Sequence, residues 1–502
     1  MIQKVLSLLA GLTLILATQF ATAAENEFLV KMSSGSSFAS QAQLTMQLPH
    51  GTQVEDLGGL GWYLVKAKSE NAQKMSIKSF KQMRGVSMAQ PNFKIKLLEN
   101  PSLAAARAQI QKLVDEGVLD EECPIPGMCG EQSMKDNPEI PAVRAPSTGN
   151  DPLFTSQWGM NDIGASQAWN KSKGSSQVVV AVLDTGIDYT HEDLVENLWR
   201  NPGETGTDSN GQNKSSNGID DDNNGYVDDV IGWDMVSDDN KPFDLAKTGI
   251  DIMFGGNPGH GTHCAGNVAA RGFNGKGISG VAPHVSIMTL RFLSEKGEGT
   301  TAGAVKAILY AINNGAHITS NSWGSVGEDP NDPDNPALRE AIRLSEQKGV
   351  LFVAAAGNGL PSTGQGYDND SSPGPAYPAS YPDDIILSVA ALDSSDNLGS
   401  FSNWGLKSVD IGAPGVKVFS TTVLGKYSDM VIDLEGIGLK VSWDGTSMAT
   451  PHVAGAAALY LSQKPNASWK EIKDAILRSA KPVSSMNGKS VSGGKLNLDT
   501  LF

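Results

Sequence analysis

The sequence has little of what nucleic-acid-binding and membrane-spanning proteins need. No Lys/Arg-rich run occurs in its 502 residues and the formal net charge is −16, so no basic face is available for phosphate groups and a nucleic-acid partner is excluded. Only one apolar run, residues 5–17, is of any length, and it is shorter than the roughly 20 residues that span a bilayer. We therefore expect no membrane partner once this segment is removed.

Residues 1–23 have the form of a secretory signal. A single charged residue, Lys4, precedes the apolar run, and Ala21-Thr22-Ala23 is a small-residue cleavage site. The alternative, a membrane anchor, would need a longer apolar run. We expect cleavage after Ala23 and a secreted or periplasmic protein.

Cysteine is also scarce, with three in the whole chain. Cys123 and Cys129 enclose a short Pro-rich segment, and in an oxidising compartment we expect them to pair. Two unpaired thiols in a loose linker are the alternative. Cys264 is then left single.

Residues 25–98 form a module that is basic where the rest is acidic, with nine Lys/Arg against five Asp/Glu. Charge complementarity favours docking of this module onto the remainder. Its pattern predicts three strands and a helix, at 27–32, 62–68, 93–98 and 75–83. Residues 99–150 contain six prolines around one Ala-rich helical piece and are predicted to be a linker.

From residue 151 to 502, short apolar runs alternate with helical patterns. The runs have the composition of buried parallel strands, and they are Val178–Leu183, Val285–Leu293, His317–Asn321, Val350–Ala356 and Ile385–Ala391. Helices are expected at Ala302–Asn314, Ala337–Lys348 and Met448–Gln463. This alternation predicts a doubly wound α/β domain with a parallel sheet and right-handed crossovers. The active site of such a domain belongs at the carboxyl ends of its strands.

Three motifs stand at strand ends or helix starts. Asp184 begins Asp-Thr-Gly, His260 begins His-Gly-Thr-His, and Ser447 lies in Gly-Thr-Ser-Met-Ala. A serine hydroxyl becomes a nucleophile when an imidazole takes its proton and a buried carboxylate orients that imidazole. Asn358, after another buried run, and the free N–H groups of a helix start can stabilise an oxyanion.

Together, in the order Asp, His, Asn, Ser, these motifs resemble the subtilisin family from about residue 151 to the end, and this order is the known one in that family. The resemblance implies a serine endopeptidase that forms an acyl-enzyme, with Asp184, His260 and Ser447 as triad and Asn358 as oxyanion side chain. Cys264 falls where the thiol-containing members, such as thermitase and proteinase K, carry a cysteine. We expect Cys264 to be a buried small hydrophobe without a catalytic role.

The resemblance also implies where protein and peptide substrates bind. Two segments match those that flank the family's specificity pocket, and they supply Ser322, Trp323, Gly324, Ala355 and Gly357. The first segment is expected to pair with an extended substrate strand. Tyr377–Pro378 matches a position at which the family has a cis proline bond.

Residues 25–98 resemble the family's propeptide, a ferredoxin-like βαββαβ unit whose last strand blocks the cleft, here around residues 92–98. The chain is then a self-processed zymogen whose own propeptide is its inhibitor. A separate adhesive or binding domain is the alternative for this module.

Two groups of oxygen-bearing residues predict calcium. The segment 220–229 reads Asp-Asp-Asp-Asn-Asn-Gly-Tyr-Val-Asp-Asp and offers Asp220, Asp222 and Asn224 at alternate positions, but position 231 is Ile, so no EF-hand glutamate closes the loop. A solvated acidic loop is the alternative. The second group rests on the resemblance, which implies a thermitase-like strong site at Asp151, Asp193, Asn274 and the backbone of Arg271 and Ile278, and a weaker cation site at Asp410.

Other functions explain less of the sequence. A secreted calcium-binding structural protein would account for the acidic loops but not for three catalytic motifs in order. A pseudoprotease usually loses a triad residue, and none is lost here. A sedolisin-type carboxyl peptidase would lack a histidine such as His260.

Overall fold

The structure is a computed structural model. It describes residues 23–33, 37–67, 75–98, 100–103, 137–142, 148–247, 256–325, 335–360, 363–371, 375–434 and 439–502, with positions 106, 109, 112, 115–117 and 252 between them. The predicted signal before Ala23 and both Cys123 and Cys129 lie outside the described residues.

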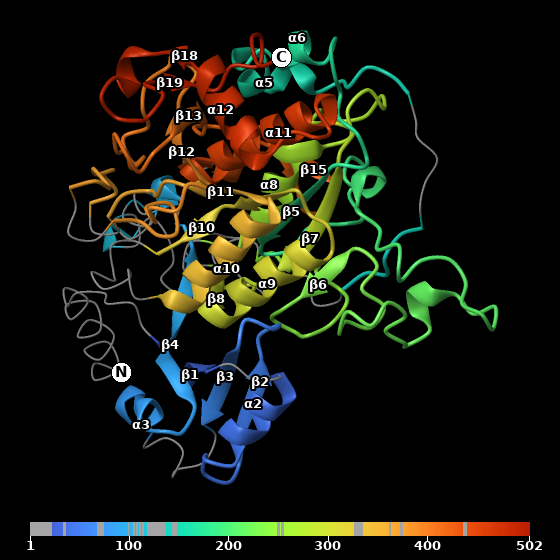
Figure 1. The fold of residues 1–502 in the computed structure, drawn as a ribbon. Helices are drawn as coiled ribbons and strands as arrows, with labels where there is room; N and C mark the ends of the chain where they lie inside the picture. Colours follow the sequence, from blue (N-terminus) through green and yellow to red (C-terminus); the bar gives the residue numbers. More distant parts are fainter. Residues whose placement is uncertain are drawn as a thin grey trace.

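Residues 23–97 form a small unit with the element order βαββαβ, drawn in blue in Figure 1. Its elements are β1 (Ala23–Met32), α2 (Ser37–Thr45), β2 (Thr52–Asp56), β3 (Trp62–Ala67), α3 (Ile77–Lys81) and β4 (Val86–Leu97). The antiparallel strands lie in the order β4-β1-β3-β2. The sequence pattern missed α2 and β2, because the first is rich in Ser and Gln and the second has a single apolar residue.

The two faces of this small sheet have different partners. Side chains alternate across a strand, so neighbouring residues point to opposite faces. Val30, Tyr63 and Val65 pack with Leu44 of α2 and Phe80 of α3 in a core of their own. Leu29, Trp62 and Leu64, one position away along β1 and β3, belong instead to the large core of the following domain. The unit therefore has one face that only the rest of the chain covers.

The larger domain is built on a nine-stranded sheet of order β18-β19-β13-β12-β11-β9-β5-β7-β6. Every pair from β13 to β6 is parallel. These strands are β5 (Val179–Asp184), β6 (Gly232–Asp234), β7 (Ser286–Arg291), β9 (Ile318–Asn321), β11 (Leu351–Ala355), β12 (Ile386–Leu392) and β13 (Ile411–Pro414), with β18 (Lys481–Pro482) and β19 (Gly494–Lys495) at one edge. The five predicted strands match β5, β7, β9, β11 and β12, so the α/β fold with a parallel sheet is confirmed.

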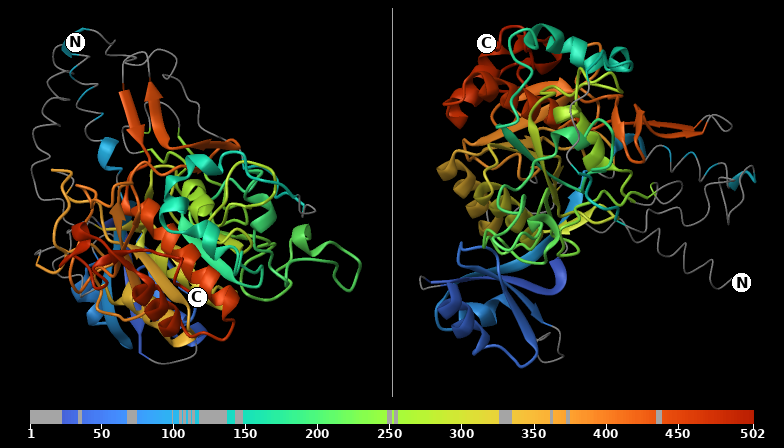
Figure 2. Two further views of the ribbon diagram at one scale, coloured as in Figure 1. Left: turned by 90° about the horizontal axis from the view of Figure 1, so that it is seen from above. Right: turned by 90° about the vertical axis from the view of Figure 1, so that its right-hand side faces the viewer.

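Helices cover the sheet in two groups, as Figures 1 and 2 show. Helices α8 (His260–Ala269) and α11 (Thr446–Gln463) pack on each other, and α12 (Trp469–Ser479) packs on α11. Helices α9 (Thr301–Asn313) and α10 (Pro336–Lys348) form the second pair. Among the described residues, no helix is both long and apolar enough to cross a bilayer.

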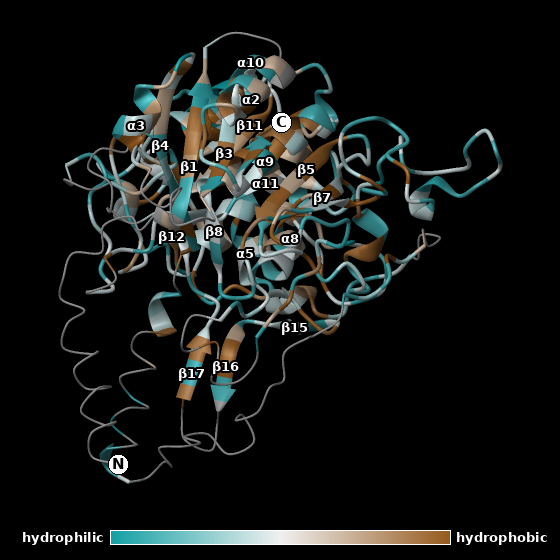
Figure 3. Cartoon of the chain, turned by 90° about the horizontal axis from the view of Figure 1, so that it is seen from below, coloured by the Kyte–Doolittle hydropathy of each residue, from teal (hydrophilic) through white to brown (hydrophobic). Residues whose placement is uncertain are grey.

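Two segments project from this domain. One is the acidic loop before β6, the long green excursion in Figure 1. The other is a two-stranded antiparallel ribbon of β16 (Met430–Leu434) and β17 (Leu439–Ser442), which follows the small β14 (Ser420–Thr422) and β15 (Lys426–Ser428) pair. Figure 3 shows the ribbon projecting from the body with apolar residues along it.

A buried ion pair ties the ends of β6 and β7 together. Arg291 Nη1 lies 2.5 Å from Asp234 Oδ2, and both side chains are almost completely buried. We expect Arg291→Ala to lower the free energy of unfolding by about 3–5 kcal/mol, because it leaves the Asp234 carboxylate buried without its counter-charge. Urea melts of the two proteins measure this. The double replacement Arg291→Leu with Asp234→Leu should cost less than the single one, and equal losses would contradict the ion-pair explanation.

Candidate active site

Three side chains from separate elements meet at the carboxyl ends of the parallel strands. Asp184 is the last residue of β5, His260 is the first of α8, and Ser447 is the second of α11. His260 Nδ1 lies 2.8 Å from Asp184 Oδ1, and both side chains are buried. The structure thus brings together the carboxylate and imidazole that the sequence motifs predicted to be partners.

A second buried carboxylate, Asp244, holds this pair in place and was not foreseen. Its Oδ1 accepts hydrogen bonds from Thr185 Oγ1 (2.9 Å) and Asn257 Nδ2 (2.6 Å), and its Oδ2 accepts from Thr262 N (3.0 Å) and Thr262 Oγ1 (2.6 Å). Asp244 therefore connects the residue after Asp184 to the first turn of α8. No motif marked it, because its partners lie 13 to 59 residues away along the chain.

Two local features fix the start of α8. Asn257 Oδ1 accepts hydrogen bonds from Gly259 N and His260 N, at 2.9 and 3.0 Å. Gly261 allows the helix to approach β5, since a Cβ atom there would lie 2.1 Å from the carbonyl oxygen of Gly186. Any larger residue would push His260 away from Asp184.

Ser447 and Asn358 lie on the other side of the site. Ser447 Oγ donates to the carbonyl oxygen of Ser322 at 3.1 Å, and no hydrogen bond joins it to His260 in the described part of the chain. The distance between a nucleophilic serine and its histidine base is commonly longer than a hydrogen bond until a substrate completes the site. Asn358 Oδ1 accepts from Thr446 N and Thr446 Oγ1, both at 2.8 Å, which turns the amide nitrogen away from Thr446 and toward the neighbouring Gly445.

The charge on the candidate base is controlled by its carboxylate. Burial opposes protonation of His260, but the negative charge and hydrogen bond of Asp184 raise its pKa well above 6.5. Burial lowers the pKa of the neighbouring His263 far below 6.5 and that of His452 to about 4, so both stay neutral. Burial raises the pKa of Cys264, whose neutral thiol lies 3.4 Å from the Ser447 carbonyl oxygen.

A strand of the small unit lies in the predicted substrate groove. The end of β4 pairs antiparallel with β10 (Trp323–Gly324) on one side and with β8 (Glu298–Thr300) on the other. Leu97 pairs with Trp323 and Lys96 with Gly324, so the next residue, Leu98, comes opposite Ser322. Leu98 is buried, and its side chain approaches Gly324, where a Cβ atom would lie 3.6 Å from Leu98 Cδ2.

The second predicted pocket segment follows β11. Ala355 is the last residue of that strand, and Gly357 N donates to Thr446 Oγ1 at 3.2 Å. The predicted cis bond at Tyr377–Pro378 is present, and Tyr377 exchanges backbone hydrogen bonds with Ser325, next to β10. Tyr377 is thereby joined to the end of the first segment, which lies beside Leu98.

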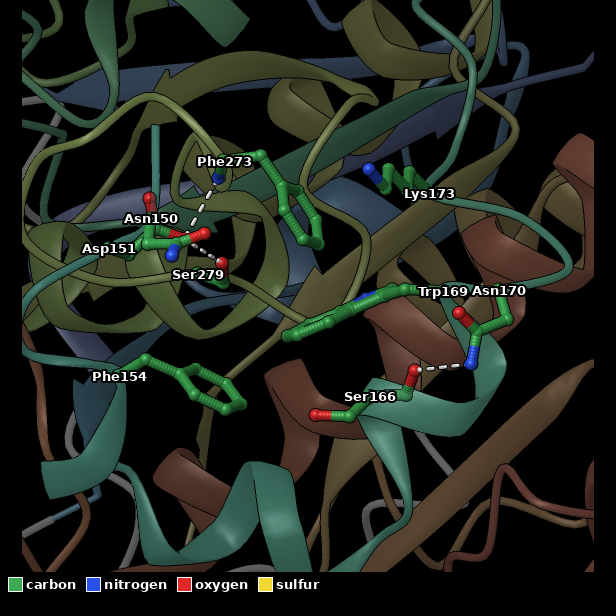
Figure 4. Close-up of a pocket in the computed structure, with 9 residues that line it drawn as sticks. All are labelled: Asn150, Asp151, Phe154, Ser166, Trp169, Asn170, Lys173, Phe273 and Ser279. Carbon is green, nitrogen blue, oxygen red and sulfur yellow. Dashed lines mark hydrogen bonds between the residues drawn. The ribbon is translucent and has the colours of Figure 1, made fainter. Parts of the chain in front are cut away.

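The predicted strong calcium site forms one network. Asn274 connects its two carboxylates, because its backbone N–H donates to Asp151 Oδ1 (3.1 Å) and its amide to Asp193 Oδ1 (2.9 Å). Arg271 N donates to the carbonyl oxygen of Asp193 and Ile278 N to Asp193 Oδ2. A pocket of about 290 Å³ lies beside Asp151. Figure 4 shows the aromatic rings of Phe154, Trp169 and Phe273 among the side chains that line it.

The acidic loop is arranged differently from the alternate-residue prediction. Oxygen atoms of Glu204, Asp222 and Asp229 lie within 4.8 Å of one another, whereas Asp220 accepts hydrogen bonds from the N–H groups of Asn224 and Gly225. Burial raises the pKa of Glu204 and raises that of Asp229 to about 6. The buried Glu204 Oε2 is without a hydrogen-bond partner among the described residues. Neither Glu204 nor Asp229 was predicted, although Asp229 ends the acidic run.

The remaining predicted cation site has a protein cation beside it. Asp410 Oδ1 lies 3.2 Å from Lys473 Nζ of α12, and Asp410 Oδ2 accepts from Ser388 N at 2.8 Å. The lysine ammonium balances the charge of the carboxylate, so Asp410 has a counter-ion without a bound metal.

Comparison with known proteins defines the class. The profile of the subtilase family, Peptidase_S8, matches residues 175–498, which span the strand ends and all three motifs. The chain belongs to the subtilase family and is a serine-type endopeptidase.

Three individual members of the family are similar in sequence to this chain. It is 35% identical over 352 residues to thermitase of Thermoactinomyces vulgaris, an alignment that covers 70% of this chain and 97% of thermitase. It is 34% identical over 351 residues to the thermophilic serine proteinase of Bacillus sp. (strain AK1), covering 70% of this chain and 68% of that protein. Subtilisin Savinase of Lederbergia lenta is 32% identical over 333 residues, covering 66% and 93%. The resemblance to thermitase-like subtilases is thereby confirmed.

The raised pKa of His260 predicts an alkaline pH profile. A general base must be neutral, so kcat/KM should rise with pH as His260 loses its proton, with the midpoint above 6.5. Asp184→Asn should move that midpoint to lower pH, because the negative charge that favours the protonated ring is lost, and should lower kcat by roughly 10⁴-fold. Stopped assays on a peptide anilide measure both. A midpoint at or below 6.5 in the unaltered enzyme would contradict this.

Proposed function

We propose that the protein is a secreted endopeptidase that hydrolyses peptide bonds of proteins through Asp184, His260 and Ser447. The observation that supports this most is the buried 2.8 Å contact between His260 and Asp184 at the strand ends, next to a groove that already holds an extended strand. The apolar, small-residue-terminated segment 1–23 supports secretion.

The proposed reaction has two halves. Ser447 Oγ attacks the carbonyl carbon while its proton passes to His260 Nε2, and Asp184 stabilises the resulting imidazolium. The oxyanion accepts hydrogen bonds from Ser447 N and Asn358 Nδ2. His260 then gives the proton to the leaving amine, which breaks the C–N bond and leaves an ester on Ser447. Water, deprotonated by His260, hydrolyses this ester and restores the serine.

We propose further that residues 25–98 are an inhibitory propeptide that is cut off at the Leu98–Glu99 bond. The groove strand β4 supports this, because its register puts Leu98 opposite Ser322, whose carbonyl oxygen contacts Ser447 Oγ. The unit is also anchored away from the groove. Glu340 of α10 accepts from Lys31 Nζ (2.5 Å) and Trp62 Nε1 (2.9 Å), and Gln90 pairs with Asn335 at 2.8 Å.

In the contact between the small unit and the larger domain, each side contributes both a positive and a negative charge. Lys31 of the small unit meets Glu340, but Glu55 of the small unit meets Lys306 of α9. The apolar face with Leu29, Trp62 and Leu64 is therefore the main contributor to docking, and the net basic charge of the unit acts at longer range.

Replacement of the nucleophile tests the triad and the cleavage site together. Ser447→Ala should leave the chain folded but lower turnover by roughly 10⁴-fold to 10⁶-fold, a range taken from subtilisin itself, the type enzyme of the family. The purified variant should stay uncut, whereas the unaltered chain should release a fragment ending at Leu98, as intact mass would show. Complete processing of Ser447→Ala without another protease would contradict the triad.

We propose calcium at two places. The first is the Asp151, Asp193 and Asn274 network, whose oxygen atoms are the hard donors that calcium prefers. The second is the cluster of Glu204, Asp222 and Asp229, where the unpartnered Glu204 Oε2 supports a cation, because a buried carboxylate oxygen without a partner is costly. Bound calcium would neutralise these groups and stabilise the folded state by mass action.

Chelation tests these sites without any contribution from self-digestion. In a Ser447→Ala background, removal of calcium should lower the thermal midpoint, since calcium at a hundred times its Kd contributes about 2.7 kcal/mol per site. Glu204→Gln and Asp193→Asn should each reduce the chelator effect in part. The exposed Asp384→Asn is the matched control and should leave the effect unchanged. Identical midpoints with and without chelator would contradict both sites.

A further inference from the structure

The chain continues beyond Leu98 along a surface that no sequence motif marked. Asn100 Nδ2 donates to the carbonyl oxygen of Ser442 at 2.7 Å, at the end of ribbon strand β17. Ser102 Oγ donates to Asp444 Oδ2, also at 2.7 Å. Because Asp444 stands three residues before Ser447, these contacts hold the residues that follow Leu98 close to the start of α11.

Other hydrogen bonds orient the Asp444 carboxylate that accepts from Ser102. Its Oδ1 accepts from Lys417 N at 2.7 Å and its Oδ2 accepts from Ser442 Oγ at 2.8 Å. The carboxylate is almost completely buried, and its ordered partners are all hydrogen-bond donors. A side chain at the position of Ser102 must therefore bring a donor, and a carboxylate there would face a like charge.

The ribbon beside Asp444 has an apolar face and a polar face. Ile432 pairs with Val441, so both side chains lie on one face of the ribbon, and both are buried. Asp433 and Lys440 pair on the other face, where they are exposed and form an ion pair of 3.3 Å. A two-stranded ribbon cannot bury a face by itself.

The segment after Ser102 contains two buried apolar side chains. Leu103 and Ala106, three residues apart and so on one side of a helical turn, are both buried. They follow directly on the two hydrogen bonds that fix residues 100 and 102 at the base of the ribbon. Figure 3 shows that the ribbon projects away from the sheet core.

We propose that the β16–β17 ribbon and Asp444 form the binding surface for residues on the carboxyl side of the cleaved bond, and that residues 100–103 occupy it in the precursor. The inference rests on the proposed cleavage after Leu98. Counted from that bond, the surface selects a hydrogen-bond donor at the fourth following residue, the place of Ser102, and an apolar residue at the fifth. Protein substrates meet the same selection once residues 100–103 have left.

Self-cleavage of the full chain tests this surface. Ser102→Asp should slow the first-order release of the amino-terminal fragment by roughly tenfold, because its carboxylate meets Asp444 instead of donating to it. In an Asp444→Asn chain the same Ser102→Asp change should lower the release rate by less than twofold, because the effects of replacing two groups in contact are not additive. Asp384→Asn, at an exposed position outside the ribbon, is the matched control and should leave the rate unchanged.

A short peptide anilide, which has no residues beyond the cleaved bond, separates this inference from the function on which it depends. The processed Ser102→Asp enzyme should hydrolyse it within twofold of the unaltered enzyme. An equal release rate for Ser102→Asp, or an undiminished penalty in the Asp444→Asn chain, would overturn the binding surface while the anilide is still cut. Failure of the unaltered enzyme to cut the anilide would overturn the proposed function and this inference with it.

Discussion

The backbone ladder between β4 and its neighbours β8 and β10 is the contact that sets which residue of the small unit stands opposite Ser322. Side chains alternate along β4, so Ile95 enters the large core while Lys96 points outward beside Glu298, 3.9 Å away. A slip of one residue would bury the lysine and expose the isoleucine. The register is therefore fixed by burial, and with it the residue that stands opposite Ser322.

The rest of the site follows from how parallel strands end. Strands β5, β9 and β11 are neighbours in the sheet, so the residues that follow them emerge at one edge although they are far apart in sequence. The topology of the sheet brings these residues near one another. Hydrogen bonds then fix their exact positions: Asp244 accepts from Thr185 and Thr262, and Asn257 accepts from the backbone N–H of His260. The sheet therefore sets the approximate positions of the active-site residues, and the buried polar residues Asp244 and Asn257 set their precise orientation.

Much of this could be predicted from the sequence, for identifiable reasons. Strands β5, β7, β9, β11 and β12 are continuous apolar runs, and Asp184, His260 and Ser447 lie in short contiguous motifs. Glu204 and Asp244 could not be found in this way, because each acquires its role from residues that only the fold brings near. The acidic loop shows the same limit: alternate spacing suggested Asp220 and Asn224, but the loop folds so that Glu204 and Asp229 meet Asp222.

The ion pair between Asp410 and Lys473 makes this part of the molecule independent of the calcium concentration of the medium. An ammonium group tethered to α12 is present at a fixed, high effective concentration, so it can be neither diluted away nor removed by a chelator. The carboxylates at the two proposed calcium sites would depend on an ion supplied by the surroundings, whereas Asp410 has a counter-ion in the chain itself. In a calcium-poor medium, loss of structure should therefore begin around Asp151 and Glu204, while the sheet edge near β13 and its covering helix α12 persist.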